Sequence, residues 1–109
     1  MSRALVVALT VLVALAGAAC GKAPRKQCEE MCRRFAELAF WDGAEREIAA
    51  APEPERAALR SKKQAEFETK LAEGVDFCVS KCRSANNEDD NKCVIAAKTF
   101  ADARKCTGN

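Results

Sequence analysis

"CEEMC" at residues 28–32 and "CVSKC" at residues 78–82 decide the fold of this 109-residue chain. Each segment carries two cysteines four positions apart, which lie on one face of an α-helix, one turn from each other. In two antiparallel helices, facing residues have numbers with a constant sum, and pairing Cys28 with Cys82 and Cys32 with Cys78 gives 110 both times. The two segments therefore predict an antiparallel helical hairpin with two disulfide rungs.

Two apolar stripes support the same register. Each repeats at steps of three and four residues, which is the period of an amphipathic helix. The register places Phe35 opposite Val75 and Ala39 opposite Leu71, and it centres the hairpin on residue 55, beside the turn signal at residues 52–54. The stripes consist of Cys28, Met31, Cys32, Phe35, Leu38 and Ala39, and of Phe67, Leu71, Val75, Cys78 and Cys82.

Composition points to the same class of fold. After residue 19 the chain has 16 Ala, only eight Val, Ile and Thr combined, and no Tyr. Ala favours helices, whereas the β-branched and aromatic residues favour strands. A chain this short has a small core and commonly needs covalent cross-links. We therefore expect an all-α fold: a disulfide-stapled antiparallel helical hairpin with a short C-terminal helical segment packed on its base.

The far end of the predicted hairpin has few apolar residues. Between residues 43 and 63 only Ile48, Leu59 and several alanines are apolar. Because proline suits the first position of a helix, we expect Pro54 to open the second helix. With so little to bury, the tip should be the least stable part of the domain.

The C-terminal segment predicts two short helices with a bend between them. Asn87 is a favoured N-cap, and the acidic run at residues 88–90 suits the positive end of a helix dipole. Thr99 and Asp102 have capping-box spacing, with Asp in place of the usual Glu, which predicts a second helix start at Thr99.

A bend at Thr99 would allow Cys93 and Cys106 to form a disulfide. In one continuous helix these cysteines would lie ~20 Å apart, which is too far for a bond. The competing solution ties Cys93 or Cys106 to a hairpin cysteine, since six cysteines allow 15 connectivities.

The N-terminus predicts a secretory signal at residues 1–19. Arg3 precedes an uncharged stretch, Ala4–Ala19, whose 16 residues are fewer than the ~20 that a spanning helix needs. A retained N-terminal membrane anchor is the alternative.

The four residues Gly17-Ala18-Ala19-Cys20 resemble a bacterial lipobox, with Gly17 where that motif usually has Leu. The resemblance implies cleavage before Cys20 and lipidation of its thiol. Removing Cys20 from the seven cysteines leaves an even six, whereas plain secretion, the other reading, leaves an odd thiol in an oxidising space. The prediction is a lipidated cysteine with a short tether at residues 20–27 and a cysteine-rich helical domain at residues 28–109.

The tether would hold the domain at a membrane of the cell envelope. The seven residues between Cys20 and Cys28 span at most ~25 Å. Several acyl chains attach a protein durably, whereas one chain does so only marginally. Gly21 stands where an aspartate signals inner-membrane retention in well-studied bacteria, so the resemblance favours the outer membrane over the inner one. The domain would be periplasmic or surface-facing.

The cysteine pattern itself resembles two groups of proteins. The paired CxxxC segments look like the twin-CxxxC helical hairpins known from the mitochondrial intermembrane space, a resemblance of cysteine geometry alone. The full pattern, ending in Cys93 and Cys106, is similar to small cysteine-rich lipoproteins of myxobacteria and their relatives. Neither resemblance implies an activity.

Charge and residue types argue against several functions. Only Arg3 of the 18 basic residues lies in the signal, so 17 basic residues face 16 acidic ones, a balance that does not predict nucleic-acid binding. On the first helix, Glu30 and Arg34 have the spacing of a supporting ion pair. The chain has no histidine and no CxxC, which removes the usual base and the usual redox motif.

We therefore expect a non-catalytic structural or protein-interaction module with no cofactor, held at the membrane by its lipid and meeting a protein partner that the sequence does not identify. The alternative is a thiol-based metal or redox carrier, since four thiolates can bind zinc. Phe40 and Trp41 are candidate contact residues because aromatic side chains are enriched at binding hot spots. They could instead pack beneath the C-terminal segment.

Overall fold

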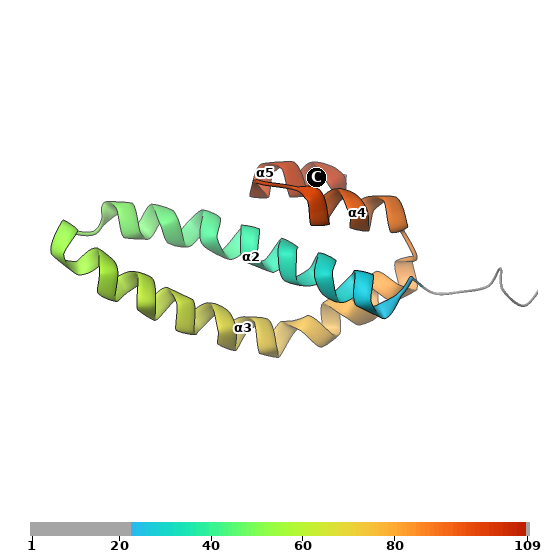
Figure 1. Ribbon diagram of the computed structural model, residues 1–109, viewed down its shortest axis with the longest axis horizontal. Coiled ribbons are helices and arrows are strands. Elements are labelled where there is room, and N and C mark those ends of the chain that lie inside the picture. The colour runs from blue at the N-terminus through green and yellow to red at the C-terminus, as the bar shows by residue number, and fades with distance from the viewer. Residues whose placement is uncertain (1–22, 109) are drawn as a thin grey trace, which may run out of the picture.

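A computed structural model describes residues 23–108, and this part of the chain is all-α, as predicted. The elements are α2 (Arg25–Ala50), the short 3₁₀ helix η1 (Glu53–Glu55), α3 (Arg56–Ala85), α4 (Glu88–Ala96) and α5 (Phe100–Cys106) (Figure 1). The predicted signal, the predicted lipidation site Cys20 and the start of the predicted tether lie outside the described residues.

The long helices α2 and α3 form the predicted antiparallel hairpin, with η1 in the turn (Figure 1). Both α4 and α5 pack mainly against α2, and α4 also meets the C-terminal end of α3, where Asn91 lies 3.4 Å from Cys82. Helix α2 therefore lies between α3 on one side and the C-terminal segment on the other (Figure 1). This leaves much of α3 open to solvent.

Two disulfides confirm the predicted register at the base of the hairpin. Cys28 bonds Cys82 and Cys32 bonds Cys78, with Cα–Cα distances of 5.7 and 5.9 Å. Near the tip, the ion pair between Glu47 and Lys63 also joins residues whose numbers add to 110. The two helices therefore keep one register from the base almost to the turn.

The turns differ in detail from the predictions. Pro54 does not open α3: it lies inside η1, and α3 begins at Arg56. At its other end α3 continues past Cys82 to Ala85. It ends there because Asn86 takes a left-handed conformation with φ 50°, which asparagine tolerates better than most residues.

The core divides into two clusters on opposite sides of α2. The first lies at the base of the hairpin around the disulfide Cys28–Cys82, where Val79 is almost completely buried. The second joins α2 to the C-terminal segment through Val94, Ala97 and Ala103. Met31 contacts both clusters.

The C-terminal segment closes on itself. Asn87 is the N-cap of α4, and the backbone N–H of Asp102 donates to the Thr99 hydroxyl at 3.1 Å, which starts α5 as predicted. The extended residues between the two helices reverse the chain, so Cys93 bonds Cys106 with a Cα–Cα distance of 5.7 Å.

The tip contains ion pairs that the apolar pattern did not predict. The Arg60 guanidinium donates to both carboxylate oxygens of Glu45, at 2.5 and 3.0 Å, and Lys63 contacts Glu47 at 2.5 Å. Ile48 is the buried apolar side chain between these pairs and the turn. The two helices thus meet at the tip mainly through charge.

Candidate functional site

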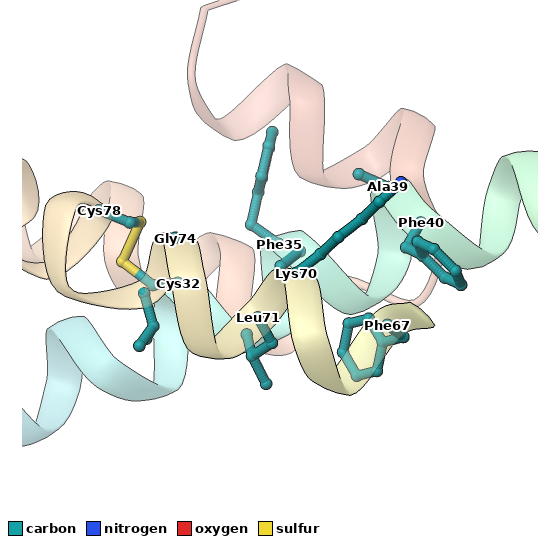
Figure 2. Close-up of a pocket in the computed structure, with 11 residues that line it drawn as sticks. Cys32, Phe35, Ala39, Phe40, Phe67, Lys70, Leu71, Gly74 and Cys78 are labelled. Atoms are coloured by element: carbon teal, nitrogen blue, oxygen red, sulfur yellow. A yellow bond between two sulfur atoms is a disulfide. The ribbon is translucent and has the colours of Figure 1, made fainter. Parts of the chain in front are cut away.

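An apolar groove of about 460 Å³ runs between α2 and α3 in the middle of the hairpin (Figure 2). A volume in this range is typical of pockets that take small organic ligands. Its lining is apolar except for one lysine. The lining residues are Cys32, Phe35, Ala36, Ala39, Phe40, Phe67, Lys70, Leu71, Gly74, Val75 and Cys78.

Small residues leave the groove empty. Ala36 and Ala39 of α2 contribute only methyl groups, and Gly74 of α3 has no side chain at all. A Cβ built on Gly74 would meet no atom within 4 Å, so neither crowding nor backbone geometry requires glycine there. Because glycine in a helix costs about 0.8–1 kcal/mol relative to alanine, this position gives up stability and leaves space.

The two ends of the groove are held by fixed contacts. The disulfide Cys32–Cys78 closes the end nearer the base, and the rings of Phe40 and Phe67, with centroids 5.4 Å apart, close the end nearer the tip (Figure 2). Phe67 is buried by this contact. The helices are therefore joined on both sides of the groove, so that collapse of the groove would have to strain a covalent rung or an aromatic pair.

Lys70 is the single charged residue that lines the groove. Its side chain reaches from α3 toward Ala39 and Phe40 of α2, and its Nζ lies 5.6 Å from the centre of the Phe40 ring (Figure 2). Within residues 23–108 no carboxylate lies within 4 Å of this ammonium. Among the described residues, Lys70 thus brings a positive charge without an ion-pair partner to the tip side of an apolar groove.

Glu47, a carboxylate whose pKa Lys70 influences, has its main ion-pair partner elsewhere. A hydrogen bond from Lys63 lowers the pKa of Glu47 below 4.5, and Lys70 makes only a minor contribution to this shift. Glu47 therefore stays ionised at neutral pH while its main partner is Lys63.

The structure places the six predicted disulfide cysteines in two regions. The rungs Cys28–Cys82 and Cys32–Cys78 lie at the base of the hairpin, and the second of them forms one end of the groove. The disulfide Cys93–Cys106 lies beyond α2, in the C-terminal segment. All six domain cysteines are thereby bonded to one another, so none of them is a thiol in this structure.

The adjacent aromatic residues Phe40 and Trp41 line different grooves. Phe40 faces α3 and lines the groove, whereas Trp41 lies with Phe100 along the junction of α2 and α5. The two rings still touch edge-on, with centroids 5.4 Å apart. Phe40 therefore does not pack beneath the C-terminal segment, the alternative considered from the sequence, whereas the half-buried Trp41 lines a surface groove beside that segment.

Two features of the surface were missed by the sequence patterns. Phe77 on α3 is 71% exposed, with the Lys81 ammonium 5.5 Å from its ring. Arg34 does not pair with Glu30: it contacts Glu37 and the C-terminal end of α4. The neighbouring sequence predicts neither the exposure of Phe77 nor the partners of Arg34, because both depend on which faces of α2 and α3 are covered.

The chain matches no protein-family model, no curated protein and no solved structure. Between residues 23 and 108, no group of three or more His, Cys, Asp or Glu side chains is arranged to hold a metal ion. In the same part of the chain, no helix is both long and apolar enough to cross a bilayer.

Proposed function

We propose that the mature chain is a lipid-anchored, non-catalytic module of the bacterial cell envelope that acts through binding. The observation that carries this proposal is the pairing of all six domain cysteines in three disulfides. Disulfides persist in oxidising compartments, so the pairing is consistent with export. Cysteines bonded in disulfides also cannot supply the thiolates that a metal or redox carrier would need.

The architecture suits a binding role. Two nested rungs and a separate C-terminal disulfide hold a small helical domain rigid, and a rigid domain loses little conformational freedom when it binds. The groove offers apolar surface and one cation, but no side chain that can serve as a nucleophile with an adjacent base. Anchoring through Cys20 would present this surface close to the membrane.

Counting thiols in the purified, non-reduced chain tests the proposal. We expect no reaction with a thiol reagent under denaturing conditions, because six cysteines form disulfides and the seventh carries lipid. The same sample should bind no stoichiometric zinc. Four reactive thiols, or one zinc per chain, would instead favour the metal-carrier alternative and overturn the proposal.

A further inference from the structure

We propose that the groove between α2 and α3 binds a free, single-chain carboxylate amphiphile such as a medium-chain fatty acid. The apolar chain would lie along the groove, and the carboxylate would meet Lys70 at its tip side (Figure 2). This inference goes beyond the proposed function, because it names a small molecule and does not require the lipid anchor.

The shape of the groove fits one narrow apolar chain. From Cys32 to Phe40 the groove follows α2 over eight helical rises, a length of about 12 Å. The disulfide and the Phe40–Phe67 pair bound it at both ends. A partner helix would need an apolar face that continues past these ends. A bounded space favours a short chain instead.

The charge of the groove selects the head group. Lys70 is the single cation among the lining residues, and no carboxylate lines the groove. One ammonium balances a singly charged carboxylate, whereas phosphate sites usually gather several donors or a helix N-terminus. The position of Nζ beside Phe40 places the charge at the end of the apolar surface, as an amphiphile requires.

Gly74 supplies the means of testing this assignment. Leucine at this position would add a side chain on the wall of the groove, and no atom lies within 4 Å of the position its Cβ would take. Because leucine is a better helix former than glycine, Gly74→Leu should fold at least as stably as the natural chain. Gly43→Leu is the matched control: Gly43 also lies inside a helix with free space around it, but it does not line the groove.

The experiment measures binding of dodecanoate to the full chain by calorimetry and by amide chemical shifts. It uses the natural chain and a Cys20→Ser chain that carries no acyl group. We expect dodecanoate to bind both, with shifts at Leu71 and Val75. Gly74→Leu should weaken binding more than tenfold, whereas Gly43→Leu should leave it unchanged. Far-UV circular dichroism checks that each variant is folded.

Dodecanol and Lys70→Gln test the charge. Removing the ammonium should weaken the binding of dodecanoate about fivefold, as expected for a partly solvated ion pair. The binding of dodecanol should not change. Equal effects on the two ligands, or no binding of dodecanoate to the folded natural chain, would overturn the proposal. So would binding to the Cys20→Ser chain alone, because the protein's own acyl chain would then fill the groove. A dimer that Gly74→Leu dissociates would overturn it in favour of a second copy.

Discussion

The guanidinium of Arg34 donates two hydrogen bonds to the carbonyl oxygen of Ala97, from Nε at 3.1 Å and from a terminal nitrogen at 2.8 Å. Ala97 is the C-cap of α4, where a helix leaves carbonyl groups without partners inside the helix. One charged side chain of α2 therefore satisfies the end of α4 and ties the C-terminal segment to the hairpin. Beside it, the rings of Phe35 and Phe100 pack edge-on with centroids 5.7 Å apart.

Replacing Arg34 should loosen the C-terminal segment. Arg34→Met keeps the apolar stem and removes the donors, and we expect it to lower the free energy of unfolding by about 1–2 kcal/mol, since hydrogen bonds to charged groups contribute on this scale. Urea unfolding measures the loss. Arg33→Met is the control, because Arg33 is exposed on the adjacent position of α2. Equal losses for the two variants would contradict a specific role for Arg34.

Removing one disulfide rung should cost the domain much less stability than removing both. Either rung alone already closes the hairpin, across 54 or 46 residues, and a disulfide over such a loop contributes roughly 4 kcal/mol. Cys32→Ala with Cys78→Ala should therefore cost only about 2–3 kcal/mol, because the outer rung still closes the hairpin. Removing all four cysteines should unfold most of the domain.

The single variant Cys32→Ala tests whether Cys32 and Cys78 are bonded to each other. It leaves Cys78 as a free thiol, which should appear in a thiol assay at one per chain. Thermal unfolding followed by circular dichroism compares the variants. A four-cysteine variant as stable as the natural chain would show that packing alone holds the hairpin.

Acidification should loosen the tip of the hairpin. Hydrogen bonds from Arg60 and Lys63 lower the pKa of Glu45 and of Glu47 below 4.5. Because the pKa is lower in the folded state than in the unfolded state, the stabilisation is complete above pH 4.5 and is lost as the pH falls through the lowered values. Protection factors for amide exchange between residues 43 and 63 should therefore decrease from pH 7 to pH 3.

The variant with Glu45→Gln and Glu47→Gln is the control for the tip. It should have low protection at both pH values, and the change between them should largely disappear. If the natural chain keeps the same protection at pH 3, these ion pairs do not hold the tip.

Loss of Cys20 should detach the protein from membranes. If Cys20 carries lipid, Cys20→Ser removes the anchor and should either release the chain into the soluble fraction or leave it unprocessed. Membrane fractionation and mass spectrometry of intact chains distinguish these results. Lys22→Ser alters the tether but keeps the thiol, so it should stay with the membranes. A Cys20→Ser chain that matures normally and sediments with membranes would contradict lipidation.

The sequence by itself determined the hairpin and its register. Cysteines four apart on a helix and the constant sum of facing positions are local rules, and they correctly placed Cys28 with Cys82 and Cys32 with Cys78. Local capping rules likewise predicted the helix start at Thr99 that brings Cys106 to Cys93. These features follow from helix geometry alone, so no knowledge of distant contacts was needed.

Tertiary structure decided which faces of the helices are covered and what remains open. Phe35 was expected opposite Val75, and both line the groove, but the ring of Phe35 packs against Phe100 because the C-terminal segment covers that side of α2. Arg34 turns from Glu30 to Ala97 for the same reason. The groove itself forms because small residues of α2 and of α3 lie opposite one another at the same height along the hairpin. Helical periodicity shows which face is apolar, but only the packed arrangement shows which part of that face has no partner.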